Sequence, residues 1–242
     1  MCTVTFIPAS GSVFLTSNRD ENKLRSRAIT PAQYDFGGSR MIYPADPDAG
    51  GTWIAAHENG NAIVFLNGAR IRHEKNPPYK KSRGLILLDL LRGGDPLHKF
   101  ECIDLQNIEP FTAVILQGMA LYQCRWDGSF KESEQLDASL PHIWSSCTLY
   151  TEDIIEKRKR WFDQWMIEHP VPTRQEIEHF HLFTGDGDQH NDLRMNRNDR
   201  ELTVSVTSMQ ISAADIFMQH HDLQSNDVSN CRLRLMKTFV EQ

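Results

Sequence analysis

Short segments of alternating apolar and polar residues, joined by tight turns, constrain this chain to folds built from antiparallel sheets. The first two segments are Thr3–Ile7 and Val13–Ser17, with a turn-forming stretch at residues 8–11 between them. Because so short a turn places two strands side by side, the pair predicts an antiparallel hairpin. In such a hairpin, the start of the first strand lies opposite the end of the second.

Further segments extend this pattern along the chain. They predict strands at Thr52–Ala56, Asn61–Leu66, Phe111–Leu116, Ala120–Trp126, Ser129–Gln135 and Glu201–Ile211, with closing strands near Phe217 and Leu233–Phe239. Apolar periodicity predicts helices at Ser82–Leu91, Thr151–His169 and Thr173–Phe183. The Pro-, Asp- and Gly-rich segments 29–50 and 185–199 are predicted to be loops. Together these elements predict one α+β domain over residues 1–242, with helices covering mainly antiparallel sheets.

Charge and cysteine content argue against several classes of protein. The 242 residues carry a net charge of −6, whereas a general nucleic-acid binder is expected to be basic. The basic run Lys157–Arg160 is predicted to be the solvated face of a helix. Five widely spaced cysteines without a CxxC pair predict reduced thiols in the cytoplasm, not disulfides or structural zinc. The sequence also predicts no secretory signal, no membrane span, no metal site and no cofactor.

Cys2 is the first candidate for catalysis. Methionine aminopeptidases remove Met1 when the next side chain is small, and removal leaves a thiol and a free α-amine on one residue. An α-amine with a pKa of roughly 7.7–8.0 can take the thiol proton and return it to a leaving group. The alternative is that Met1 stays and Cys2 is a small buried side chain.

The run Asn18–Glu21 ends the second strand of the predicted hairpin, so it is expected to lie beside the N-terminus. There Arg19 could lower the pKa of the Cys2 thiol. Asp20 or Glu21 could hold the α-ammonium group in place.

Two other motifs offer groups for acyl transfer. Asn67 and Gly68 end a predicted strand, where the Asn amide and the following backbone N–H could stabilise an oxyanion. An ordinary turn is the alternative for this pair. In the run GGTW at residues 50–53, the glycines permit close backbone approach, and Trp53 is a candidate substrate contact.

The strand-to-helix corner His142–Cys147 is a further candidate. Cys147 could pair with His142 as an alternative nucleophile, although no orienting acid is evident.

With these residues in hand, the sequence resembles the NRDE family, also called the transport and Golgi organisation type 2 family. The shared marks are Met1-Cys2, the run at residues 18–21, the GGTW run at 50–53, and Asn67. This family is similar to N-terminal-nucleophile hydrolases of the choloylglycine hydrolase and penicillin V acylase type. The resemblance therefore implies an αββα sandwich with mainly antiparallel sheets.

The resemblance also implies roles near the N-terminus. Cys2 would be the nucleophile and Arg19 its neighbour. Asp20 would hold the α-amine, with Glu21 or Asn22 as alternatives.

Elsewhere, the resemblance implies that Asn67 is the oxyanion residue. The hydrolases' second Asn corresponds to a position near Ser145, which becomes a candidate substrate contact. Their late arginine corresponds to Arg194, chosen over Arg197.

The leading hypothesis is thus a cytoplasmic amidohydrolase or acyltransferase that acts on a small-molecule or acyl substrate, with segment 185–199 as a lid. One alternative is a non-enzymatic carrier of an apolar ligand, such as a lipid, acyl-CoA or haem, on the same fold. A hydrolase based on Cys147 is a third. The sequence leaves the oligomeric state open.

Overall fold

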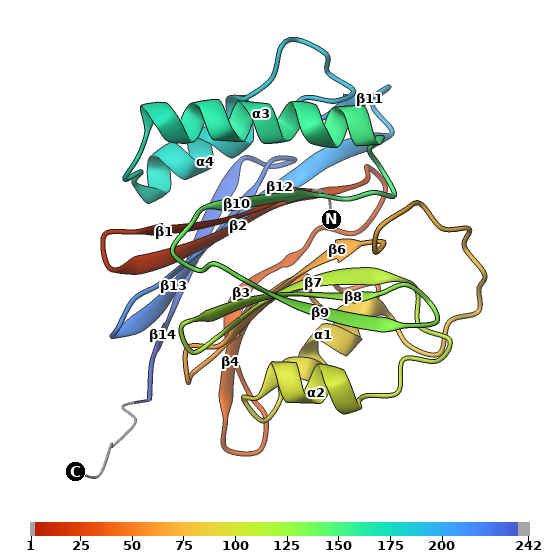
Figure 1. Ribbon diagram of the computed structural model, residues 1–242, viewed down its shortest axis with the longest axis vertical. Coiled ribbons are helices and arrows are strands. Elements are labelled where there is room, and N and C mark those ends of the chain that lie inside the picture. The colour runs from red at the N-terminus through yellow and green to blue at the C-terminus, as the bar shows by residue number, and fades with distance from the viewer. Residues whose placement is uncertain (1–2, 237–242) are drawn as a thin grey trace.

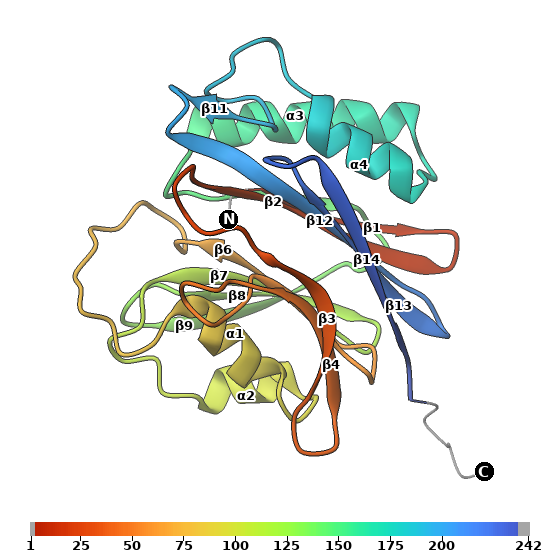
Figure 2. The same ribbon diagram turned by 180° about the vertical axis from the view of Figure 1, so that it is seen from behind.

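Two antiparallel sheets lie face to face at the centre of the protein, and a pair of helices covers the outer face of each (Figure 1). The computed structural model describes residues 3–236. The reverse view in Figure 2 shows the same order of layers. The predicted αββα sandwich is therefore confirmed.

Sheet A contains the N-terminal hairpin. Its strand order is β10 (His142–Ser145), β1 (Thr3–Ala9), β2 (Ser12–Asn22), β12 (Glu201–Ile211), β13 (Asp215–Asp222) and β14 (Asp227–Arg234), and β11 (Asn196–Arg197) pairs with β12. In the hairpin, Thr3 lies opposite Asn18. The prediction that the start of β1 adjoins the NRDE run is therefore confirmed for the described residues.

Sheet B runs through the chain in nearly sequential order. Its strands are β3 (Ile29–Asp35), β4 (Arg40–Ala45), β5 (Ile54–His57), β6 (Ala62–Asn67), β7 (Phe111–Gln117), β8 (Ala120–Trp126) and β9 (Lys131–Leu136). Helices α1 (Arg83–Leu91) and α2 (Pro96–Cys102) cover this sheet, whereas α3 (Glu152–Glu168) and α4 (Arg174–Phe183) cover sheet A.

The two-residue period of the strands separates the cores of the layers. In β6, Val64 and Leu66 belong to the cluster between the sheets, whereas Ile63 and Phe65 pack with α1 and α2. A third, smaller cluster joins sheet A to Phe162 of α3. Because apolar side chains fill the space between the layers, a site can open at the strand ends, where the layers separate.

Four elements differ from the predictions: β3, β4, α2 and the two-residue strand β11, which lies in segment 185–199, also predicted to be a loop. Segment 29–50, predicted to be a loop, contains β3 and β4; β3 is an edge strand, where Pro31 is tolerated because one side of the strand needs no partner. Helix α2 was not predicted, because its seven residues are too few for a clear apolar period. The last predicted strand, Leu233–Phe239, falls partly outside the described residues.

No helix among residues 3–236 is both long enough and apolar enough to cross a membrane.

Candidate active site

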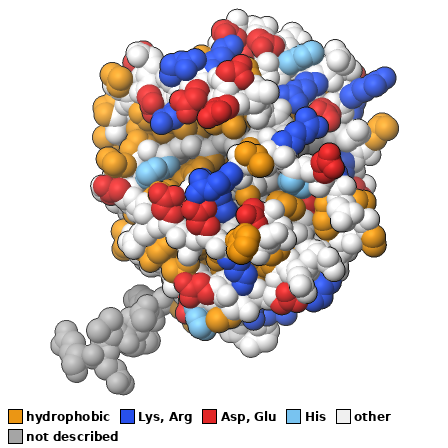
Figure 3. Space-filling model, turned by 45° about the vertical axis from the view of Figure 1, so that its right-hand side comes forward, with side chains coloured by type: hydrophobic (Ala, Val, Ile, Leu, Met, Phe, Trp, Pro, Cys, Tyr) orange, Lys and Arg blue, Asp and Glu red, His pale blue; other side chains and the backbone are white. Residues whose placement is uncertain are grey.

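A cleft opens where β2 leaves sheet A and β6 leaves sheet B. It has an outer chamber of about 860 Å³ and an inner chamber of about 500 Å³. The two chambers share walls formed by Glu21, Asn67, Lys75, Arg83 and Glu109. Figure 3 brings this side of the molecule forward and shows acidic and basic side chains intermixed across it.

The NRDE run divides its side chains between two faces of sheet A, because successive residues of a strand point to opposite sides. Asn18 and Asp20 face the layer that holds α3 and α4, as their hydrogen bonds show. Arg19 and Glu21 face the other way and line the inner chamber, while Asp20 also contributes to the wall of the outer chamber. One short motif thus supplies both structural anchors and cleft residues.

Asn18 anchors α4 to the sheet. Its amide nitrogen donates to the backbone carbonyls of His181 (3.1 Å) and Leu193 (2.7 Å), and its Oδ1 contacts His181 Nδ1 at 2.5 Å. Because Asn18 Oδ1 can only accept, Nδ1 of His181 carries the proton, and Nε2 accepts from the Thr5 hydroxyl at 2.8 Å. Burial, together with the charge of Arg158, lowers the pKa of His181 to about 3, so this histidine is neutral near pH 7.

Asp20 is buried beside the start of β1. Its carboxylate accepts from Tyr150 Oη at 2.8 Å and from Thr203 Oγ1 at 2.5 Å. Arg158 lies 3.6 Å above the Tyr150 ring and donates to Thr3 Oγ1 at 2.6 Å. The prediction that Arg158 is solvated is therefore wrong: it is fully buried, because carbonyl and ring acceptors replace water.

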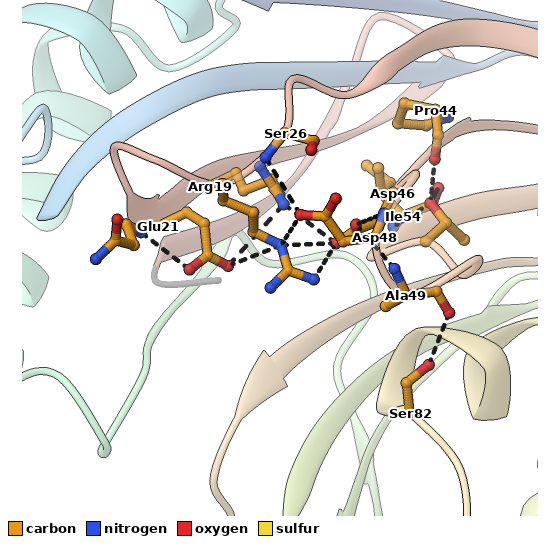
Figure 4. Close-up of polar contacts among 12 residues, drawn as sticks. Arg19, Glu21, Ser26, Pro44, Asp46, Asp48, Ala49, Ile54 and Ser82 are labelled. Carbon is orange, nitrogen blue, oxygen red and sulfur yellow. Dashed lines mark hydrogen bonds and ion pairs between the residues drawn. The ribbon is translucent and has the colours of Figure 1, made fainter.

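Arg19 is a buried cation on the wall of the inner chamber, and Figure 4 shows its contacts with acidic side chains. Its Nη2 lies 3.2 Å from Asp46 Oδ2 and 3.9 Å from Glu21 Oε2, and its guanidinium carbon lies 4.9 Å from the centre of the Trp53 ring. Arg25 also donates to Asp46, at 2.8 Å. These contacts fix the guanidinium at the base of the cleft.

The GGTW run positions Trp53 against Arg19. Gly51 passes so close to α1 that a Cβ there would lie 2.3 Å from the carbonyl carbon of Gly84. The close approach expected of the two glycines is thus observed for Gly51, whereas a Cβ on Gly50 would meet no atom within 4 Å and this glycine only shapes the loop. Trp53 is buried and its Nε1 has no hydrogen-bond partner among residues 3–236, as is also true of Nε2 of the neighbouring His220.

Asn67 ends β6 and contributes to the walls of both chambers. Its backbone carbonyl accepts from Ser146 Oγ at 2.8 Å, which ties the end of sheet B to the segment after β10. The suggestion that the Gly68 N–H serves an oxyanion is wrong, because this group donates to the Pro110 carbonyl at 3.0 Å.

Two predicted residues lie away from the cleft. Arg194 is exposed and lines a separate cavity of about 420 Å³ together with Lys23. The alternative, Arg197, donates to the Leu149 carbonyl at 2.9 Å, close to the wall of the outer chamber. Ser145 lines a third, smaller cavity beyond Asn67.

The alternative pair of Cys147 and His142 is not assembled. The Nε2 atom of His142 is within 2.8 Å of the Asp137 carbonyl oxygen, and its ring stacks on Trp144. Burial raises the pKa of the Cys147 thiol, which disfavours the thiolate that nucleophilic attack requires.

The sequence did not point to several cleft residues. Segment 72–75 lines the outer chamber, and Glu109 contacts Arg83 at 3.1 Å and His73 at 3.4 Å. Apart from Arg83, which begins α1, these residues come from loops with no periodic pattern, so no local signal could have assigned them. Cys2, the predicted nucleophile, lies outside the described residues.

Comparisons with known proteins agree with this architecture. An N-acylethanolamine-hydrolyzing acid amidase ortholog from Caenorhabditis elegans is 13% identical with a TM-score of 0.62, over 86% of this chain and 92% of that chain. A mutant of conjugated bile acid hydrolase from Clostridium perfringens is 11% identical with a TM-score of 0.57, over 100% of both chains. A second variant of that hydrolase has the same identity and score over 99% of this chain and 100% of its own. These distant likenesses show a shared fold.

No curated protein matches the chain. The model of the family described as Transport and Golgi organisation 2, however, matches residues 1–230. Taken with the NRDE run, the GGTW run and Asn67, this nearly full-length match establishes that the chain belongs to the Transport and Golgi organisation 2 family.

Proposed function

We propose that the protein is an N-terminal-nucleophile amidohydrolase or acyltransferase that uses Cys2 after removal of Met1. One observation carries the proposal: Arg19, Glu21 and Asn67, from two sheets, line one cleft at the end of the hairpin where β1 begins. Cys2 is bonded to Thr3, whose partner across the hairpin is Asn18, the residue before Arg19. The shared fold with amide-hydrolysing enzymes supports the same chemistry.

In the proposed reaction, the Cys2 thiolate attacks the carbonyl carbon of an amide. The new C–S bond forms, and the amide side chain of Asn67 stabilises the oxyanion. The C–N bond then breaks, and the α-ammonium group of Cys2 gives its proton to the departing amine. Water, or an acceptor amine, attacks the thioester carbonyl, and the α-amine takes the proton of the attacking group. The C–S bond then breaks, which releases the acyl product and restores the Cys2 thiolate beside the α-ammonium group.

The other predicted residues have supporting roles in this scheme. Arg19 favours the thiolate through its positive charge, and Trp53 holds Arg19 in place. Asp20 orients the α-amine in the proposal, since it is buried at the strand end opposite β1. We also propose a cytoplasmic location, with support from the free state of the four described cysteines.

An apolar-ligand carrier has less support from the walls of the cleft. Of the residues lining the outer chamber, Leu149 and Met195 are the apolar members, and most of the others are charged. A lipid or haem site is normally lined mainly by apolar and aromatic side chains.

Mass spectrometry of the intact protein tests the proposal. Incubation with p-nitrophenyl butyrate should add one butyryl group to a Met-free chain, and peptide mapping should place the group on Cys2. The Cys2→Ala variant should lose this adduct, whereas Cys147→Ser should keep it. Retention of Met1 in protein that still forms the adduct would contradict the self-base mechanism, and an adduct unaffected by Cys2→Ala would exclude Cys2 as the nucleophile.

A further inference from the structure

A third cavity, of about 230 Å³, lies on the far side of Asn67 from the cleft. We call it the Arg125 cavity. Its walls include Asn67, Arg70, Gln123, Arg125, Trp144, Ser145 and Cys147. Asn67 borders both this cavity and the cleft, whereas the two arginines of the cavity have no role in the proposed acyl transfer.

Arg125 lies in the wall of this cavity, and its guanidinium group has no close carboxylate partner in the described part of the chain. Its side chain is 18% exposed, and its best carboxylate contact is Nη1 to Glu132 at 3.8 Å. That is too long for a good hydrogen bond. The Nε atom is buried and has no acceptor among residues 3–236. A buried N–H of a charged group without an acceptor lowers the stability of the folded state. Within the described residues, the Nε–H of Arg125 is therefore a strong hydrogen-bond donor without a partner.

The neighbouring carboxylate is already occupied. Arg70 holds Glu132 through Nε at 3.1 Å and through Nη2, in the two-pronged geometry that arginine prefers with carboxylates. Two arginines therefore share Glu132, and only Arg70 contacts it closely. Burial lowers the pKa of Arg125, and the charge of Arg70 acts in the same direction, whereas the charges of Glu132 and Glu134 oppose both effects.

The other walls do not supply an anion. Gln123 accepts from Trp144 Nε1 at 2.7 Å and donates to Glu134 at 3.1 Å, so its amide is engaged. Burial raises the pKa of the Cys147 thiol, so it is uncharged near neutral pH. The remaining wall groups are the amide of Asn67, hydroxyl groups and apolar side chains, and Ser145 offers a hydroxyl donor.

We propose that the Arg125 cavity binds the oxyanion group, carboxylate or phosphate, of a small molecule. A planar guanidinium with an unused Nε–H matches the paired oxygens of either group. The volume is below the usual range for whole drug-sized ligands, roughly 300–1,000 Å³, and suits one charged end group and a few further atoms. Arg125 itself takes no part in the proposed acyl transfer.

Thermal unfolding of the full chain tests this site. Sodium phosphate, acetate and succinate are titrated separately at constant ionic strength, with sodium chloride as the reference. A saturable rise in Tm with phosphate alone identifies a phosphate site, and a rise with a carboxylate alone identifies a carboxylate site. A rise with both identifies a general oxyanion site. No rise beyond that in chloride overturns the proposal.

Variants place the binding. Arg125→Gln should weaken the apparent affinity at least tenfold, whereas Arg72→Gln, on the wall of the outer chamber, should leave it unchanged. The reverse result puts the anion in the cleft and overturns the proposal. If Arg125→Gln does not fold, Arg125→Lys is tested instead, because lysine keeps the positive charge but lacks the paired N–H donors of the guanidinium. The affinity for the anion should then weaken at least threefold, and unchanged affinity refutes the role of Arg125. A Cys2→Ala variant should bind as the wild type does, which separates this test from that of the proposed function.

Discussion

Acid should destabilise this protein through His181, which is fully buried and uncharged. Unfolding exposes the ring, whose pKa then returns to about 6.5. Because burial lowers the folded-state pKa to about 3, the unfolded chain binds one more proton than the folded chain at any pH between these values. Stability from this residue is therefore fully present above the unfolded pKa and is lost as the pH falls toward the folded one.

The magnitude follows from the distance below the unfolded pKa. Between pH 7 and pH 5, one such histidine lowers the free energy of unfolding by about 2 kcal/mol, at roughly 1.4 kcal/mol per pH unit below 6.5. His220 acts in the same direction, since burial lowers its pKa to about 4 despite the opposing effect of Asp222. The wild type should thus lose about 4 kcal/mol over this range, and a variant without His181 about 2 kcal/mol.

Urea unfolding followed by tryptophan fluorescence at pH 7 and pH 5 measures this difference. His181→Gln removes the titrating ring, and His179→Gln, an exposed histidine on the same helix, is the matched control. His181→Gln also loses hydrogen bonds with Thr5 and Asn18, so its stability at pH 7 falls as well. The informative quantity is the change between the two pH values.

The burial argument is refuted if His181→Gln and the wild type lose the same free energy of unfolding between pH 7 and pH 5. It is also refuted if His179→Gln shows the smaller loss instead. A wild type that gains stability on acidification would reverse the predicted sign outright.

Three further predictions rest on single contacts. Gly51→Ala should lower the free energy of unfolding by more than about 2 kcal/mol, because its Cβ would meet backbone atoms that cannot rotate away. Calorimetry would show a lower Tm, and an unchanged Tm would mean that the strand and α1 separate easily. Tyr150→Phe should lower the free energy of unfolding measured in urea by about 1.5–3 kcal/mol, since it removes a hydrogen bond to the buried carboxylate of Asp20. A loss of less than about 0.5 kcal/mol would show that another group replaces the hydroxyl. Cys147 should react with iodoacetamide more slowly than exposed Cys102 at pH 7, and equal rates measured by peptide mass would contradict the raised pKa of its thiol.

The parts of the fold that the sequence predicted depend on local patterns. The register of β1 against β2 follows from one turn, because the turn fixes which residues face each other. Segment 29–50 was misjudged because Pro31 argues against a strand, and the position of β3 at a sheet edge, which removes that objection, is a property of the whole sheet. Sequence order alone does not reveal which strand is at an edge.

The candidate site likewise combines residues that the local sequence predicted with residues that only the whole fold identifies. Arg19 could be chosen from its position opposite the start of β1, but its partner Asp46 could not, since a loop and two strands separate them in the chain. Arg158 was assigned to solvent because it lies in a basic run, yet its acceptors are carbonyls of Asn191 and Asp192, more than thirty residues further on. Side chains that depend on distant partners are visible only once the fold brings those partners together.

The strand period explains why a four-residue run can mark both a fold and a candidate site. Asn18 and Asp20 each satisfy buried polar groups from the helix-bearing side of sheet A, so they fix how the N-terminal hairpin sits against that layer. Arg19 follows Asn18 and Glu21 follows Asp20, so this anchoring places both of them on the cleft side of the strand. Since a shift of one residue in register would exchange the two sets, the anchors on one face determine which charges reach the cleft on the other. The order of anchor and cleft residue along β2 therefore follows from the two-residue period and the layered fold together.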